Sequence, residues 1–315
     1  MQGFKIVRAD EPIKERPLVI TVFGQPGIGK TSLGFTMPAP VLHLDFDRGF
    51  TRAVQSCRPD SAQIDNFGWF YAYFQSDEFA LYITHQGVKS VIVDTAGAML
   101  EDFCAPYLVT VDRKNGNASG GLSLAGWGAL SILANNIKNR LQSLGVHIMF
   151  VAHSKDQGED AICRMDLAVK GGSSDIITRV SDQIGFVYAE GKARMLDFTP
   201  CQTHLGKDTA RLGKVAIPDA DSDSFQGFMA GIVQKANDRM FALSQAQLDA
   251  KAKIAELKEA LQKCAKPADF EKFSKLLEKE GQTIKLQLRT AFTERMAAAG
   301  VSFKDKKFIS NEIQG

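Results

Sequence analysis

The chain has 315 residues, of which 44% are hydrophobic, and a formal net charge of +2 at pH 7. A chain of this length and composition buries a sizeable core, with room for one large α/β domain and an appendage. The near-neutral charge excludes a protein that holds nucleic acid by its overall charge, so any such contact depends on local basic clusters.

Cysteine usage and the N-terminus indicate an intracellular setting. The five cysteines, at positions 57, 104, 163, 201 and 264, include no C-x-x-C pair, which argues against a disulfide framework or a structural zinc site. The N-terminus has no apolar signal core, and no stretch reaches the length of a membrane span. We therefore expect a soluble, cytoplasmic protein that does not bind membranes.

The predicted strand Leu18–Phe23 leads into a glycine-rich segment, residues 24–32, with the sequence GQPGIGKTS. A strand, a glycine loop, a lysine, a hydroxyl and then a helix form the phosphate-binding loop motif. The glycines let successive backbone N–H groups point at phosphate oxygens. Lys30 is expected to contact the β- and γ-phosphates, and the Thr31 hydroxyl to ligate Mg²⁺. The pattern predicts a site for ATP and Mg²⁺ formed by Gly24, Gln25, Pro26, Gly27, Ile28, Gly29, Lys30, Thr31 and Ser32.

The second predicted strand, Val41–Asp45, runs into the sequence LDFDRG at residues 44–49. Carboxylates two positions apart on a strand point to the same face, and the carboxyl edge of an open α/β sheet borders the ligand crevice. Asp47 lies further along the chain toward the phosphates, so we predict that it polarises the attacking water. The alternative is an aspartate that only shapes the turn before Gly49.

The third predicted strand, Val88–Asp94, ends in VIVDT at residues 91–95, the pattern of a Walker B element. Asp94 is expected to hold the magnesium through a water or the Thr31 hydroxyl. The alternative role for Asp94 is the N-cap of the predicted helix Ala96–Pro106.

A helix, Ala125–Leu144, and a fourth strand, Val146–Ala152, precede His153. A polar side chain at this strand end is placed to detect the γ-phosphate and to pass its presence to the next loop. The alternative is an ordinary surface histidine. A hairpin follows, with strands at 183–189 and 193–198, so the series indicates a mostly parallel sheet covered by helices.

Beyond residue 222 the predicted strands stop. We expect a core domain at 1–222 and an all-helical extension at 223–315, with helices at 225–240, 245–264, 268–279 and 283–299. One narrow apolar stripe in the extension consists of Ala250, Ile254, Leu257, Leu261 and Cys264. Such a stripe packs either on its own domain or against a partner helix.

The ordered set GQPGIGKTSL, LDFDRG, VIVDT and VAHSK resembles the RecA-type ATPase core. More closely, it resembles phage-encoded AAA-type ATPases of the core-only RecA/RadA-like single-strand annealing family, over about residues 4–220. The resemblance implies a RecA-like P-loop fold and an ATPase, slow or stimulated by DNA, in the host cytoplasm. RecA-type proteins usually have a catalytic glutamate at the position of Asp47 and a sensor glutamine at that of His153.

The resemblance also implies DNA contacts. RecA-like proteins touch single-stranded DNA with the loops after Walker B and after the sensor strand, which correspond here to the glycine- and polar-rich segments 112–121 and 154–174. We expect both to be long mobile loops. Their cations would neutralise DNA phosphates; the alternative is an ordinary solvated loop. The candidates are Arg113, Lys114, Lys155, Arg164 and Lys170.

Basic residues after the closing hairpin reach a neighbouring subunit's γ-phosphate in RecA-like assemblies. The resemblance therefore implies a homo-oligomer, a ring or a filament, with Lys207 and Arg211 as trans-acting residues. The alternative is a pair of ordinary surface cations.

Three functions follow from these patterns. The first is a DNA recombination or annealing ATPase that assembles on single-stranded DNA with ATP between subunits. The second is a helicase-like or helicase-loading ATPase. The third is a nucleotide switch whose helical tail binds a protein partner.

Overall fold

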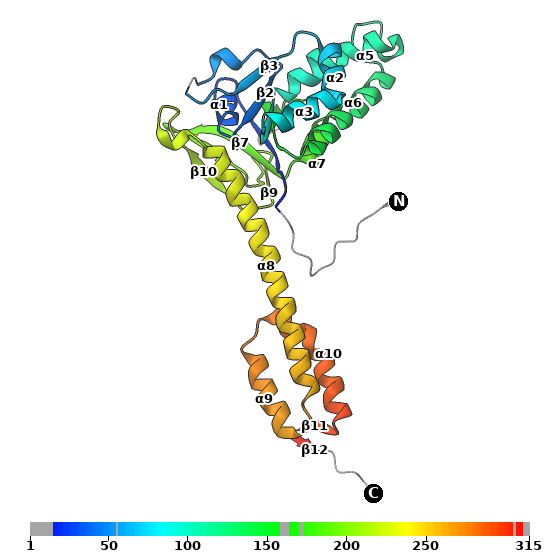
Figure 1. Ribbon diagram of the computed structural model, residues 1–315, viewed down its shortest axis with the longest axis vertical. Helices are drawn as coiled ribbons and strands as arrows, with labels where there is room; N and C mark the ends of the chain where they lie inside the picture. The colour runs from blue at the N-terminus through cyan, green and yellow to red at the C-terminus, as the bar shows by residue number, and fades with distance from the viewer. Residues whose placement is uncertain (1–14, 55, 158–163, 170–172, 305–306, 311–315) are drawn as a thin grey trace. The chain divides into compact units, whose positions relative to one another are not determined.

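The computed structural model describes residues 15–54, 56–157, 164–169, 173–304 and 307–310 (Figure 1). These residues form two compact units, one at Glu15–Arg239 and one that begins at Met240. The division lies inside helix α8 (Phe228–Gln262), whereas the sequence analysis ended the core at residue 222. In the described part of the chain, no helix is both long and apolar enough to cross a membrane.

The first unit is built on a ten-stranded sheet whose main path runs β10-β8-β7-β1-β5-β4-β2-β3. The pairs from β7 to β3 along this path are parallel, and β8, β10, β6 and β9 pair in the antiparallel sense. The strands are β1 (Val19–Gly24), β2 (Val41–Asp45), β3 (Asp60–Gln63), β4 (Ser90–Asp94), β5 (His147–Gln157), β6 (Arg164–Leu167), β7 (Gln183–Glu190), β8 (Ala193–Asp197), β9 (Lys207–Asp208) and β10 (Lys214–Ile217). The predicted mostly parallel sheet flanked by helices is confirmed.

Strand β5 lies between β1 and β4, so the phosphate-loop strand and the Walker B strand are not neighbours. The register sets Gly24 opposite His153, and Asp94 opposite both Val151 and Asp45. Because these strands are parallel, their carboxyl ends meet at one edge of the sheet. The strands β1, β2 and β4 are buried along their whole length, as expected for their continuous apolar runs.

Helices cover this sheet, and Figure 1 shows α2, α3, α5 and α6 grouped beside the strands. Asn66, Ser76 and Ser123 cap α2, α3 and α6 by accepting backbone N–H groups of the first turn. Side chains of these helices and of the strands share one apolar core. The helices and short helical turns are α1 (Lys30–Gly34), η1 (Phe50–Arg52), α2 (Phe67–Gln75), α3 (Asp77–His85), α4 (Ala96–Ala98), η2 (Met99–Cys104), α5 (Ala105–Val111), η3 (Arg113–Asn115), α6 (Leu124–Ser143), α7 (Ser173–Val180) and η4 (Asp223–Phe225).

The two segments expected to be mobile loops have more structure than predicted. In the first, the turn η3 is followed by a compact bend in which the side-chain Oδ1 of Asn117 accepts the N–H groups of Ser119 and Gly121. In the second, β5 continues to Gln157 and β6 pairs back against it, so the described residues 154–157 and 164–167 are paired strands. The polar composition of these segments gave no sign of this structure. The first segment is held by the Asn117 side-chain amide, and the second by pairing between β5 and β6.

The second unit contains the later part of α8, the helices α9 (Pro267–Glu278) and α10 (Gln282–Ala298), and a hairpin of β11 (Val301–Lys304) and β12 (Lys307–Ser310). The prediction of an all-helical extension was therefore wrong at its end, and the two helices expected at 225–264 are one. The stripe residues Ile254, Leu257, Leu261 and Cys264 are buried in this unit's own core, together with Phe270 and Leu288. Their burial favours packing on the chain's own domain over a seam for a partner helix.

Candidate nucleotide site

A cavity of about 310 Å³ opens at the carboxyl edge of the parallel strands, within the size range of small-molecule sites. Residues from the phosphate loop, the segment after β2, and the ends of β4 and β5 surround it. They are Pro26, Gly27, Gly29, Lys30, Thr31, Ser32, Asp47, Gly49, Arg52, Ala53, Asp94, Thr95 and His153.

The phosphate loop depends on glycine at three positions. Gly27 and Gly29 have φ angles of 79° and 97°, in the left-handed region that side chains disfavour. A Cβ at Gly24 would lie 2.4 Å from the carbonyl oxygen of Val187 in β7, so a side chain there would force the two strands apart. Backbone conformation and strand packing thus explain the glycines that the motif requires.

Lys30 begins α1 and is 5% exposed. Its ammonium donates to the carbonyl oxygens of Gly24 and Gln25, at 3.0 Å and 2.8 Å. Burial lowers the pKa of Lys30 to about 8, although the carboxylates of Asp94 and Asp47 act in the opposite direction. A bound triphosphate would add negative charge beside Lys30 and so favour its charged ammonium form.

Thr31 and Asp94 form the second part of the site. The Thr31 hydroxyl donates to Asp94 Oδ2 over 2.6 Å. Asp94 Oδ1 is buried and has no hydrogen-bond partner among the described residues. The N-cap of α4 is Thr95, whose hydroxyl accepts the N–H of Ala98, so Asp94 does not have that alternative role. A hydroxyl and an unpaired carboxylate oxygen at the cavity wall fit the oxygen ligands that Mg²⁺ prefers.

His43 is a site residue that the sequence analysis missed. Its ring is fully buried, with Nε2 3.4 Å from Asp94 Oδ2 and Nδ1 2.9 Å from Ser61 Oγ. The imidazole therefore contacts the same Asp94 carboxylate oxygen as the Thr31 hydroxyl. A histidine in the middle of the apolar strand VLHLD was the available signal, because a buried polar group needs partners.

The two aspartates around β2 separate into different roles. Asp45, the last residue of β2, accepts the N–H groups of Gly49 and Phe50 at 2.9 Å and 3.2 Å, so it is the turn aspartate. Asp47 lines the cavity, and burial followed by the nearby Asp94 charge raises its pKa. A Cβ at Gly49 would lie 2.6 Å from Asp47 Oδ1, so glycine leaves room for this carboxylate. Since the strand ends at Asp45, the two side chains do not share a strand face as expected.

His153 lies on β5 beside the phosphate loop and lines the same cavity. Its Nδ1 is buried without a hydrogen-bond partner in the described part of the chain. Burial and the positive charge of Lys30 lower the pKa of His153, so its imidazole is neutral at pH 7. A neutral ring can accept or donate one hydrogen bond to a phosphate oxygen.

A family model described as an AAA domain matches residues 16–210, from just before β1 to just past β9. The matched range is more than half of the chain and includes every residue of the cavity. The chain belongs to the AAA domain family. A comparison with curated proteins returned no match. AAA domains are P-loop ATPases, so family membership implies that this cavity binds a nucleotide.

The AAA domain also contains an arginine at the phosphate loop that the motifs did not reveal. Arg194 on β8 donates to the carbonyl oxygens of Ile28 and Pro218, at 3.5 Å and 3.1 Å. A Cβ at Gly29 would lie 2.5 Å from its Nη1, so the guanidinium is packed directly against the loop. Its place depends on the pairing of β8 with β7 and of β7 with β1, which no local pattern shows.

The two predicted trans-acting residues, Lys207 and Arg211, do not line the cavity of their own chain. The Lys207 ammonium donates to the carbonyl oxygens of Thr178 and Arg179 at the end of α7, where it satisfies two terminal carbonyls. Arg211 is exposed, and its carbonyl oxygen accepts Arg239 Nη1. Their action on a neighbouring subunit stays a prediction.

The predicted DNA-binding residues of the AAA domain fall in two places. Arg113 and Lys114 are exposed on η3, which is tied to α6 because the Ser123 hydroxyl donates to the Lys114 carbonyl oxygen over 2.6 Å. Lys155 and Arg164 lie on the β5–β6 hairpin, with Lys155 half-buried and Arg164 exposed. Lys170 lies outside the described residues.

Proposed function

We propose that this AAA-domain protein hydrolyses ATP with Mg²⁺ and acts on single-stranded DNA in recombination or strand annealing, as the RecA/RadA-like annealing proteins of phages do. The observation that carries the ATPase part is the Asp47 carboxylate, which lines one cavity with Lys30, Asp94 and His153. These four side chains cover the chemical roles that phosphoryl transfer to water requires.

In this mechanism Lys30 and the loop N–H groups bind the β- and γ-phosphates. Magnesium, held through Thr31 and Asp94, would neutralise charge on the same phosphates. Asp47 accepts a proton from water as the water oxygen attacks the γ-phosphorus and the bond to the bridging oxygen breaks. The raised pKa of Asp47 makes its carboxylate a better proton acceptor than an exposed aspartate. His153 contacts the γ-phosphate and reports its loss.

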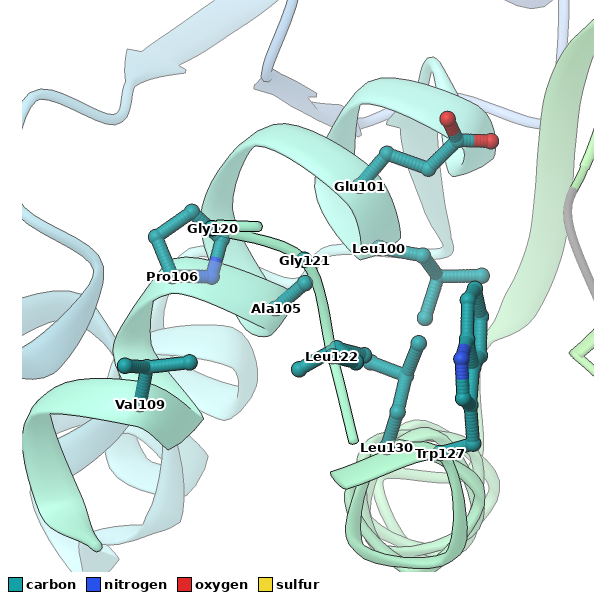
Figure 2. Close-up of a pocket in the computed structure, with 10 residues that line it drawn as sticks. All are labelled: Leu100, Glu101, Ala105, Pro106, Val109, Gly120, Gly121, Leu122, Trp127 and Leu130. Atoms are coloured by element: carbon teal, nitrogen blue, oxygen red, sulfur yellow. The ribbon is translucent and has the colours of Figure 1, made fainter. Parts of the chain in front are cut away.

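Support for DNA binding comes from an apolar hollow of about 400 Å³ next to the helix that follows Walker B. Figure 2 shows Leu100, Leu122 and Trp127 around this hollow, with Glu101 directed away from them. Trp127 is 37% exposed. An accessible indole can stack on a nucleic-acid base, and such stacking contributes about 1–3 kcal/mol per base.

Charge near the hollow is consistent with a DNA backbone. Arg113 and Lys114 are exposed on η3, and the glycines that follow at 120 and 121 line the hollow. In the hairpin of β5 and β6, strand β5 continues without a break from His153 to Lys155. A change at the γ-phosphate can therefore pass along one strand to a cation of the hairpin, which would make DNA binding depend on ATP.

The proposal includes a homo-oligomer with ATP at subunit interfaces, in which Lys207 and Arg211 act on a neighbour's nucleotide. The support is that neither residue lines the cavity of its own chain. Electron microscopy with ATP, with and without single-stranded DNA, tests the assembly. A DNA-dependent ring or filament is expected, and a protein that stays monomeric under all conditions would contradict it.

DNA binding is tested by fluorescence anisotropy of a labelled single strand at fixed salt, with and without ATP. We expect ATP to tighten binding, and Lys155→Ala to weaken it without loss of ATP binding. Equal affinity for wild type and Lys155→Ala would contradict the assignment of the hairpin as a DNA contact.

One observation favours a second candidate, a nucleotide switch with a protein-binding module. The residues from Met240 onward form a compact unit with a core of their own, including Phe270, Phe273 and Leu288. Removal of this unit distinguishes the candidates. A DNA-binding ATPase keeps ATP-dependent DNA binding without it, whereas a switch loses its partner and never binds DNA.

A further inference from the structure

A cysteine, a histidine and an aspartate come together in the segment after β8, away from the nucleotide cavity. Cys201 is exposed, and its Sγ lies 3.1 Å from His204 Nδ1 and 3.1 Å from Thr203 Oγ1. His204 Nε2 lies 4.0 Å from Asp197 Oδ2, at the end of β8. The sulfur also lies 3.7 Å from His204 Nε2, so it sits over the imidazole ring. A thiol in contact with an imidazole that has a carboxylate beside it brings together the groups of an activated nucleophile.

The imidazole is held in place by packing. His204 is 7% exposed, and its ring stacks on Phe186 of β7 with centroids 5.1 Å apart. The backbone on either side is fixed to β6, because Met165 N–H donates to the Thr203 carbonyl oxygen and Leu205 N–H to the Met165 carbonyl oxygen, both over 2.9 Å. The Cys201–His204 contact therefore belongs to an ordered turn.

Hydrogen bonds at the sulfur, rather than the charges around the pair, favour ionisation of the Cys201 thiol. Burial and the charge of Arg164 lower the pKa of His204 against the effect of Asp197, so the ring is neutral and free to accept a proton at pH 7. For Cys201, slight burial raises the pKa, but the hydrogen bonds of Thr203 and of the backbone at 203 and 204 outweigh it, and the net pKa is lowered. The Asp197 charge raises the thiol pKa by less than these bonds lower it.

The other described cysteines have the opposite environment. Cys104 and Cys264 are buried, Cys57 is half-buried, and burial raises the pKa of all three thiols. Reactivity follows the fraction of thiolate and its access to solvent. Of these four thiols, only Cys201 combines exposure with a lowered pKa.

We propose that Cys201 is a nucleophilic thiol and a site of oxidation by hydrogen peroxide and related hydroperoxides, with His204 as the proton acceptor. The Cys201 sulfur attacks one peroxide oxygen, an S–O bond forms, and the O–O bond breaks. The sulfur loses two electrons to the peroxide, and the leaving hydroxide takes the proton from His204 and departs as water. The product is a sulfenic acid; one thiol converts it to a mixed disulfide with release of water, and a further thiol reduces that disulfide to free Cys201.

The test is site-resolved mass spectrometry of the full-length protein. Iodoacetamide at pH 7 is expected to alkylate Cys201 at least about tenfold faster than Cys57, and peroxide followed by dimedone is expected to label Cys201. His204→Asn should slow both reactions at Cys201 by about tenfold, since the proton acceptor is gone. His85→Asn, at an exposed histidine on α3, is the matched control and should change neither rate.

Two outcomes would overturn the proposal. One is alkylation of Cys201 no faster than that of Cys57. The other is an unchanged Cys201 rate in His204→Asn. Should that variant fold poorly by circular dichroism, the pH dependence of Cys201 alkylation in the wild-type protein decides. We expect its midpoint below that of the same peptide in urea, and equal midpoints would refute the proposal.

Discussion

The low pKa of Lys30 predicts that ATP binding weakens as the pH rises from 7.5 to 9. Only the ammonium form binds the β- and γ-phosphates, and in the free protein this form is lost around a pKa of about 8. The protonated fraction falls from about three-quarters at pH 7.5 to about one-tenth at pH 9, so the Kd should rise roughly eightfold. His153 does not contribute in this window, because its pKa is lowered and its ring is already neutral.

The same shift predicts a change in the free energy of unfolding of the nucleotide-free protein. The folded state lowers the pKa of Lys30, so between pH 8 and 10.5 the unfolded chain binds more protons, and stability rises with pH. The full effect is about 3 kcal/mol, since each pKa unit corresponds to about 1.4 kcal/mol. Lys30→Met removes the titrating group, so wild type should gain about 3 kcal/mol relative to this variant across that window.

Binding of a fluorescent ATP analogue, titrated at constant Mg²⁺ and ionic strength, measures the first effect, and urea unfolding measures the second. Lys30→Arg is the control, because a guanidinium stays charged through pH 9 and should abolish the pH dependence of the Kd even if its affinity is lower. A wild-type Kd that is constant from pH 7.5 to 9 would refute the reasoning, as would an equal pH dependence in Lys30→Arg.

Three further predictions concern other parts of the site. Asp47→Asn should keep ATP binding and lower kcat by about 10²-fold or more, measured as phosphate release; retained turnover would exclude Asp47 as the base. His43→Ala should raise the Mg²⁺ concentration needed for half-maximal activity, because Asp94 loses the ring that orients it, and an unchanged Mg²⁺ dependence would contradict that role. Trp127→Ala should weaken single-stranded DNA binding, measured by anisotropy, by about 1–3 kcal/mol. Trp69→Ala, at an indole that is 82% exposed on α2, is the control and should leave DNA binding unchanged. Equal losses in both variants would contradict the hollow as a base-stacking site.

Elements with strong local signals were predicted well. The strands β1, β2 and β4 fall within a residue or two of the expected ranges, because each is a short apolar run between turn residues. The segment that forms β3, α2 and α3 was not assigned. Its strand is four residues long and partly exposed, and its helices carry aromatic side chains that fit either structure.

The amino-acid sequence by itself singled out the phosphate loop, Asp94 and His153, which line one cavity in the structure. In each case the chemistry depends on residues close together in the chain, so spacing alone reveals it. The separate roles of Asp45 and Asp47 required the structure, because they depend on where β2 ends.

Only the tertiary structure decided what surrounds these motifs. His43 meets Asp94 across neighbouring strands, and Arg194 reaches the phosphate loop from β8. Cys201 and His204 are only three positions apart in the chain, but Phe186 of β7 and Met165 of β6 hold their contact in place. Partners brought together by strand order and register leave no periodic trace in the sequence, since pairing between distant strands is set by the whole sheet.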